Sequence, residues 1–339
     1  MDFRLPENRR EAFIRWFVWQ LRTTDCDPNV ALLNYIFERQ EYNIQQKLWL
    51  AWIYGTTYHL PAAYVIWNEF PDMENVDLER LKNWNNTNYA KLRYQTDTKY
   101  NKGHLPAMFE SYRNAVGTDQ LAKFRELCTG TPQENYEVVF KFVVKNFHKF
   151  GRYLTWFYVQ TLKECVGLPL EPKDLLLSDS GSASHRDGLC FVTARDDWTS
   201  KYYENGKKVY REIKYDDDKV SYLQRKADGI LAEIKTRFPD VSQCLNYYRM
   251  ETALCSFKKL FRTRDGRYLG YYLDRQAEEI RKVEADGWYG VDWEIMWDYR
   301  NECLLPGINY RNATIDKKRM RTFPETGQMP ELSLYPDLL

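Results

Sequence analysis

Apolar residues recur at helical spacing along most of this chain. In residues 7–22, Phe13, Trp16 and Phe17 fall at the three- and four-residue intervals that place side chains on one face of a helix, with charged residues between them. The pattern therefore predicts a mostly α protein. Similar stretches predict helices at 29–40, 76–84, 105–116, 118–128, 133–147, 151–165, 219–236, 242–262 and 271–285.

Residues 45–70 form a longer apolar stretch that Gly55 and Pro61 interrupt. Proline is tolerated in the first turn of a helix, so this stretch predicts two helices that meet at 56–60, with Pro61 opening the second. The polar residues at 56–59 lie between two very apolar helices. We expect them to be hydrogen-bonded or functional.

Two other stretches break the helical pattern. Gly- and Ser-rich sequence at 167–188 predicts a loop, and Asn205-Gly206 between pairs of β-prone residues predicts a small hairpin near 200–212. The sequence has no internal repeat and no low-complexity linker. We expect one helical domain over 1–304, as a single body or two lobes, followed by an extended C-terminal tail at 305–339.

Composition narrows the class of protein. The 339 residues are 44% hydrophobic and 29% charged, with a net charge of +1, which excludes a polybasic protein but permits a local basic patch. Aromatic residues make up 16%, and we expect most of them to fill the core, although stacking on bases is the alternative. No signal peptide and no run of about 18 apolar residues is found, so we expect a cytoplasmic protein with no membrane partner.

Cysteine and histidine patterns give no metal motif. The seven cysteines are widely spaced without a C-x-x-C pair, and the four histidines include no H-E-x-x-H. These patterns predict reduced, mostly buried thiols and no zinc site.

Three polar stretches could carry chemistry. The turn at 147–153 places Gly151 between two apolar helices, where free backbone N–H groups can bind phosphate, although an ordinary interhelical turn is the alternative. Residues 178–188 combine hydroxyls and carboxylates with an imidazole and a guanidinium, and a solvated loop is the alternative there. In the helix at 247–262, Glu251, Lys258 and Arg262 share a face, either as a salt-bridged surface or as an anion-binding wall.

Two stretches resemble the helix-hairpin-helix DNA glycosylase superfamily. Residues 48–71 present an apolar helix, a polar turn, a second helix and a Phe-Pro pair, and residues 147–156 are similar to the hairpin, with Lys149 in place of its first glycine. This resemblance implies a DNA-binding scaffold that extrudes a base, with DNA contacts at Lys149, Gly151 and Arg152. The family's catalytic Asp would be Asp179 or Asp187.

A narrower resemblance covers residues 45–300. The segments 184–189, 249–259 and 267–275 resemble phage amino acid:DNA transferases, also called α-glutamyl/putrescinyl thymine pyrophosphorylases, and the helical domain of related hydroxymethyluracil DNA kinases. The chain has no P-loop, so a kinase role is not supported.

The second resemblance implies a reaction on double-stranded DNA that carries 5-pyrophosphoryloxymethyluracil. The amine of a free amino acid or polyamine would displace pyrophosphate at the exocyclic methylene. The incoming amine must lose a proton to one of three candidate carboxylates, Asp187, Asp179 or Glu251. Cations are needed for the leaving group, and an aromatic ring for the extruded base. The candidate substrate-binding residues are His185, Arg186, Lys258, Lys259, Tyr58 and Arg275.

No organic cofactor is expected, and a divalent metal ion on the pyrophosphate remains open. Two other functions are compatible with the same residues. A DNA glycosylase or lesion-binding protein would use an Asp to stabilise a sugar cation. A non-catalytic DNA-binding protein would use the aromatic helical core only as a scaffold.

Overall fold

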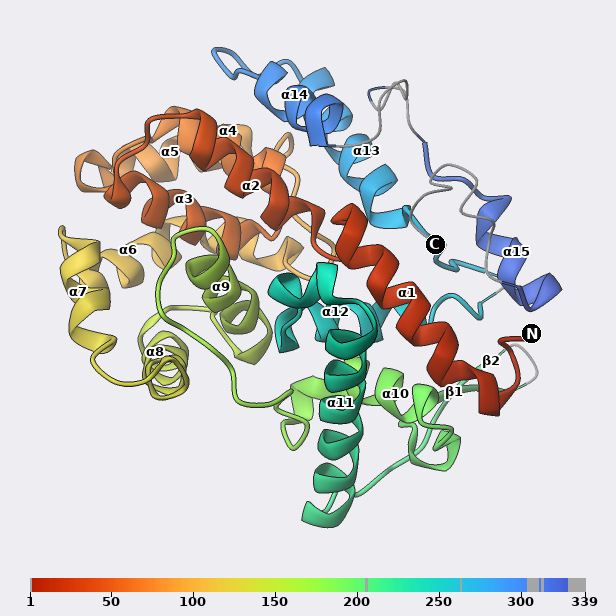
Figure 1. Cartoon of the computed structure of the whole chain (residues 1–339). Coiled ribbons are helices and arrows are strands. Elements are labelled where there is room, and N and C mark those ends of the chain that lie inside the picture. The colour runs from red at the N-terminus through yellow and green to blue at the C-terminus, as the bar shows by residue number, and fades with distance from the viewer. Residues whose placement is uncertain (1, 205–206, 263, 304–310, 312–313, 329–339) are drawn as a thin grey trace. The chain divides into compact units, whose positions relative to one another are not determined.

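The structure is a computed structural model that describes residues 2–204, 207–262, 264–303, 311 and 314–328 (Figure 1). These residues form fifteen α-helices, six short 3-10 helices and one two-stranded sheet, which confirms the predicted mostly α class. The chain forms two compact units. Unit 1 comprises residues 1–28, 173–275 and 314–339, and unit 2 comprises 29–172 and 276–313.

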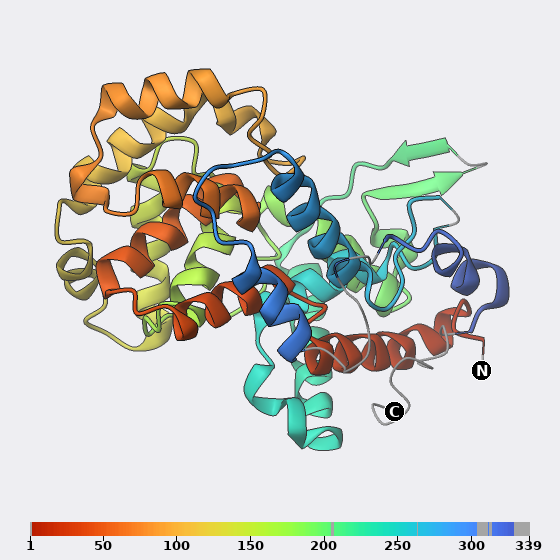
Figure 2. The same cartoon turned by 90° about the horizontal axis from the view of Figure 1, so that it is seen from above.

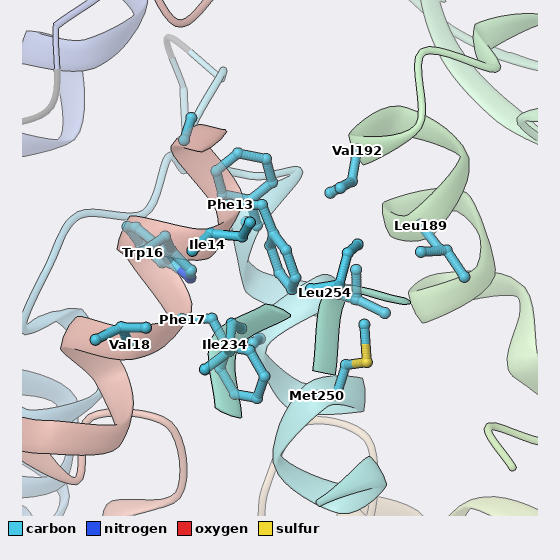
Figure 3. Packing of buried hydrophobic residues seen from close by; sticks show 14 of the residues in the cluster. Phe13, Ile14, Trp16, Phe17, Val18, Leu189, Val192, Ile234, Met250 and Leu254 are labelled. Atoms are coloured by element: carbon cyan, nitrogen blue, oxygen red, sulfur yellow. The ribbon is translucent and has the colours of Figure 1, made fainter. Parts of the chain in front are cut away.

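Unit 1 is built around four helices whose apolar faces form one core (Figure 3). Phe13 of α1 meets Phe257 of α12 edge-on at 5.3 Å, and the indole N–H of Trp16 donates to Ser256 Oγ at 3.3 Å. The core helices are α1 (Arg9–Thr23), α10 (Ala183–Val192), α11 (Asp217–Arg237) and α12 (Tyr247–Phe257). The 3-10 helices of this unit are η1 (Pro6–Asn8), η4 (Ser180–Ser182), η5 (Asp196–Trp198) and η6 (Pro239–Cys244).

Helices α10 and α12 approach each other at Gly188. A Cβ atom at this position would lie 2.3 Å from the Leu254 carbonyl oxygen and 2.8 Å from its carbonyl carbon. Backbone atoms cannot move aside as a flexible side chain can. Only glycine therefore permits this distance between the two helices.

Unit 1 also contains the predicted hairpin, whose two antiparallel arrows are plain in Figure 2. Strand β1 (Lys201–Glu204) pairs with β2 (Lys207–Tyr210), with Lys201 opposite Tyr210. The turn residues 205–206 on which the prediction rested lie outside the described residues.

In unit 2, helix α3 (Ile44–Thr57) packs against α4 (Leu60–Glu69) and α9 (Arg152–Glu164). Its aromatic residues are buried as expected. The Trp49 and Trp52 rings stack at 5.0 Å, and Trp52 stacks on Tyr112 at 4.7 Å. The other elements are α2 (Pro28–Arg39), η2 (Met73–Asn75), α5 (Leu78–Asn88), η3 (Lys99–His104), α6 (Leu105–Val116), α7 (Gln120–Leu127), α8 (Pro132–Asn146) and α14 (Glu294–Cys303). Helix α13 (Tyr271–Ala285) is divided between the units after Arg275.

The junction of α3 and α4 confirms the prediction for Pro61, which lies in the first turn of α4. The polar residues before it are hydrogen-bonded. Thr56 Oγ1 donates to the Ile53 carbonyl at 2.7 Å, and His59 Nδ1 accepts from the backbone N–H of Ala62 at 3.3 Å. His59 is thus the N-cap of α4.

Three predicted boundaries are wrong. Residues 183–188 begin helix α10 rather than continuing a loop, because buried side chains recur there at helical spacing although several are polar. The helix expected over 242–262 is divided, with η6 before it and α12 starting only after the N-cap Asn246. In the predicted tail, α15 (Arg319–Thr326) is helical because Phe323 is buried edge-on against Phe261 at 4.7 Å.

Helix α14 was not predicted from the sequence. None of the described helices is long and apolar enough to cross a membrane.

Two glycine substitutions test the α10–α12 contact. We expect Gly188→Ala to lower the free energy of unfolding by about 1–3 kcal/mol, because the added methyl meets rigid backbone. Gly229→Ala, on the exposed face of α11 with nothing within 4 Å, should raise it by up to about 1 kcal/mol. Urea unfolding measures both. A Gly188→Ala variant as stable as the wild type would contradict the proposed contact.

Candidate functional site

A buried ion pair in unit 1 joins α10 to α12. His185 Nδ1 lies 3.0 Å from Glu251 Oε1, and both side chains are at most 4% exposed. His185 Nε2 lies 2.9 Å from the Leu175 carbonyl oxygen. Because a carbonyl oxygen only accepts, Nε2 carries a proton and Nδ1 faces the carboxylate.

The surroundings of His185 hold it in the charged form. Burial alone would lower the pKa of the imidazole. Hydrogen bonds to Cys255 and Glu251, together with their charges, outweigh burial and raise the pKa of His185 to about 9. At neutral pH the His185 side chain is therefore an imidazolium beside the Glu251 carboxylate.

Cys255 completes this group. It follows Glu251 by one helical turn on α12, so both side chains lie on the same face. Its Sγ, an imidazole nitrogen of His185 and a carboxylate oxygen of Glu251 all lie within 4.8 Å of one another. Among the described residues, these three atoms could hold a metal ion, because imidazole, carboxylate and thiolate are the ligands that zinc takes in proteins.

Positive charge gathers at the C-terminal end of α12. The Lys258 ammonium donates to the Ser184 carbonyl of α10, and burial lowers its pKa. Burial and the charges of Arg267, Lys258 and Arg262 lower the pKa of Lys259 to about 8. The cations therefore repel one another, and an anion bound among them would relieve that repulsion.

Electrostatics connect the start of α13 with this group. Burial raises the pKa of Tyr272 to about 12, and the nearby charges of Arg267 and Arg275 act against that rise, while Cys255 adds to it. The Arg267 guanidinium lies 4.0 Å from the centre of the Tyr271 ring. Arg275, a predicted substrate-binding residue, and Cys255 are thus both close to Tyr272.

The structure gives Arg186 and Asp179 structural partners. Arg186 Nη1 donates to the carbonyl oxygens of Leu177 at 2.6 Å and Asp179 at 3.0 Å, and its guanidinium lies 3.8 Å from the centre of the Tyr215 ring. Asp179 is exposed, and its carboxylate accepts from the backbone N–H of Gly181 at 2.7 Å. Arg186 therefore fixes the loop before α10, and Asp179 caps η4.

The third predicted carboxylate, Asp187, is buried and hydrogen-bonded. It accepts from the backbone N–H of Ser200 at 2.8 Å and from Ser200 Oγ at 2.9 Å. This bond attaches α10 to the segment that leads into β1. The charge of Asp187 also acts on Lys258, so the carboxylate is near the cations although it is engaged by Ser200.

The predicted DNA contacts belong to unit 2. Lys149 is exposed and has φ +65°, in the left-handed region that favours glycine. Gly151 is the N-cap of α9, and the Arg152 guanidinium lies 5.1 Å from the centre of the Trp156 ring.

Tyr58, predicted to stack on an extruded base, is also in unit 2. It ends α3 with φ +48°, is half-buried, and packs against Phe157 with ring centres 4.4 Å apart. Its stacking role remains a prediction.

The structure thus brings together five of the predicted residues in unit 1, namely His185, Asp187, Glu251, Lys258 and Lys259. Sequence reasoning missed Cys255 and Tyr272 as members of the group. The signal for Cys255 was its spacing, since it follows Glu251 by four residues and precedes Lys258 and Lys259 by three and four.

Comparisons with known proteins point to one family. A family model described as amino acid:DNA transferase matches residues 23–266, which is more than two thirds of the chain. A curated relative, the serinyltransferase of Salmonella phage ViI, is 27% identical over 345 residues. That alignment covers 96% of this chain and 83% of the relative.

The pH dependence of stability tests the charge of His185. An ordinary histidine has a pKa of about 6.5, so the folded protein with His185 near 9 binds more protons than the unfolded chain between these values. The stabilisation is therefore complete below about pH 6.5 and is lost as pH rises through 9. We expect the stability gap between wild type and His185→Gln to shrink by roughly 2–3 kcal/mol over this window.

Urea unfolding between pH 6 and 9.5 measures that gap. The control is His148→Gln, because burial and the charges of Lys149 and His104 lower the pKa of that exposed histidine. The difference in stability between the wild type and His148→Gln should stay constant above pH 6.5. A gap for His185→Gln that stays constant from pH 6.5 to 9 would refute the imidazolium assignment.

Proposed function

Because this chain belongs to the amino acid:DNA transferase family, we propose that it attaches an amino acid to 5-pyrophosphoryloxymethyluracil in double-stranded DNA. A nucleophilic atom of the amino acid bonds to the exocyclic methylene carbon. The bond from that carbon to the pyrophosphate oxygen breaks, and pyrophosphate leaves with the electron pair. The reaction thus needs a site for a highly charged leaving group and an acceptor for one proton.

The observation that carries this proposal is the group of cations at the end of α12. Lys258, Lys259, Arg262 and Arg267 act on one another's charge, and burial with this repulsion lowers the pKa of both lysines. A pyrophosphate among them would supply several negative charges. Cations held in place before the reaction stabilise such a leaving group as its charge develops.

Glu251 is the carboxylate that best suits the proton transfer. Asp179 caps a 3-10 helix, and Asp187 is hydrogen-bonded to Ser200. Glu251 instead lies within the group that contains His185 and is two turns of α12 before Lys258. We infer that it accepts the proton that the attacking amino acid loses as the new bond forms.

The second substrate is inferred from the family and its curated relative. The family description names an amino acid, and the relative is named a serinyltransferase. These names support an amino acid over a polyamine, and they make serine the first amino acid to test.

Contact with DNA is assigned to unit 2. Lys149 is exposed in the turn before α9, and Gly151 leaves the first backbone N–H groups of that helix free of a side-chain cap. Such a helix start binds phosphate. Arg152 is the third predicted contact, and Tyr58 is the ring proposed to stack on the extruded base.

The full chain should be incubated with a duplex oligonucleotide that contains 5-pyrophosphoryloxymethyldeoxyuridine and, separately, with serine, the other amino acids or putrescine. Digestion to nucleosides followed by mass spectrometry identifies the product. We expect a nucleoside heavier than hydroxymethyldeoxyuridine by one amino acid residue, with release of one pyrophosphate. A free base with an abasic site, or an unchanged nucleoside, would contradict the proposal.

Lys259→Met tests the anion site. The loss of one charge-assisted contact, worth about 1.5–3 kcal/mol, should lower kcat/KM for pyrophosphate release by roughly 10- to 100-fold. Because the lowered pKa of Lys259 means that its charge costs stability, the variant should unfold at no lower urea concentration than the wild type.

Lys235→Met is the matched control for Lys259→Met, since Lys235 is exposed on α11 of the same unit. Its kcat/KM should equal that of the wild type. Unchanged pyrophosphate release by Lys259→Met would remove this lysine from the leaving-group site.

A further inference from the structure

Cys255 has a role in neither the binding nor the proton transfer proposed so far. It is partly exposed, whereas Cys26 and Cys190 in the same unit are buried. His185 is hydrogen-bonded to it, and Glu251 completes the group within 4.8 Å. A partly exposed thiol beside a histidine and a carboxylate is the arrangement of a nucleophile with its base and an orienting group.

Charged groups surround the Cys255 side chain. Lys258 and Lys259 lie close enough for their charges to act on the sulfur, and His185 is held as an imidazolium beside it. Reactive cysteines occupy partly exposed, electropositive surroundings of this kind. These cations would also repel a metal ion bound to the Cys255 sulfur, because like charges repel.

The proposed substrate offers the Cys255 sulfur a target. In uracil, C6 is the β-carbon of an unsaturated carbonyl that runs from C6 through C5 to the C4 carbonyl. A soft nucleophile that bonds to C6 turns C5 and the C4 carbonyl into an enolate. That enolate can expel a leaving group from the methylene carbon attached to C5.

We propose that Cys255 is a covalent catalyst whose Sγ adds to C6 of the pyrimidine. This inference rests on the proposed function. In the first step the S–C6 bond forms, and the electron pair of the C5=C6 bond moves into the enolate. The thiol proton stays on His185. In the second step the enolate pair forms an exocyclic C5=CH2 bond, and the C–O bond to pyrophosphate breaks on the side of Lys258 and Lys259.

The third and fourth steps restore the ring and the enzyme. The amino acid nucleophile bonds to the methylene carbon and returns an electron pair to the enolate, and its proton goes to Glu251. The enolate then re-forms the C5=C6 bond, the C6–S bond breaks, and Cys255 leaves as the thiolate. No oxidant or reductant is needed, and the net change is one amino acid for one pyrophosphate.

Attack by Cys255 at the methylene carbon itself would give an alkyl thioether, which is a poor leaving group. An adduct at C6 is reversible, because the enolate formed in the third step expels the sulfur. The geometry of an imidazolium, a carboxylate and two ammonium groups around one thiol thus serves both halves of the reaction.

An isotope effect tests the bond to C6 without any variant. Pyrophosphate release by the full chain should be followed in a single turnover, with substrate duplex that carries hydrogen or deuterium at C6. Addition changes C6 from trigonal to tetrahedral, so the deuterated substrate should react faster. Equal rates would show that C6 does not change before pyrophosphate leaves, and would overturn the proposal.

Two cysteine variants give the second measurement. Without an amino acid, the wild type and substrate duplex should form a covalent protein–DNA adduct of the summed mass less pyrophosphate, seen by intact-mass spectrometry. Cys255→Ala should form none and should lose pyrophosphate release, while it binds the duplex as tightly as the wild type. Cys244→Ala, at an exposed cysteine in the same unit, should behave as the wild type.

The outcomes separate the two proposals. A wild type that makes no modified nucleoside from any amino acid overturns the proposed function, and the role of Cys255 with it. An active wild type whose Cys255→Ala variant releases pyrophosphate at the same rate overturns only the covalent role. A zinc-dependent activity would also overturn only the covalent role. In that case a chelator removes the activity and zinc restores it, and the wild type binds one zinc ion while Cys255→Ala binds none, because Cys255 is a metal ligand.

Discussion

The site depends on the close approach of α10 and α12 where Gly188 meets the Leu254 carbonyl. With no side chain at position 188, the two backbones come near enough for polar groups of the two helices to bond. Both bonds use the turn of α10 that precedes Gly188, where His185 meets Glu251 and the Ser184 carbonyl accepts from Lys258. A larger residue at 188 would separate both pairs.

The positive charges at the end of α12 cost stability. The pKa of Lys259 is lowered because the ammonium is buried near other cations, whereas that of His185 is raised because it has anionic partners. A protein selected only for stability would not gather unbalanced cations at one helix end. An anion bound among these cations would reduce their mutual repulsion.

The sequence was sufficient for the helices that carry a regular apolar face, such as α1 and α9, and for the capped junction at Pro61. It was not sufficient for α10, because the buried face of that helix begins with Ser182 and His185. Polar side chains of this kind are typical of a loop, so the apolar pattern predicts no helix there. Their partners come from distant segments, which periodicity cannot reveal. For the same reason the sequence does not distinguish Cys255 from the other cysteines, because its partner His185 comes from α10.

The cations at the end of α12 are proposed to hold pyrophosphate beside Cys255. Alkylation by iodoacetamide, followed at the peptide level by mass spectrometry with and without inorganic pyrophosphate, tests it directly. Pyrophosphate should slow the labelling of Cys255 in a saturable way and leave the labelling of the exposed Cys244 unchanged. Labelling of Cys255 at the same rate at every pyrophosphate concentration would contradict the account.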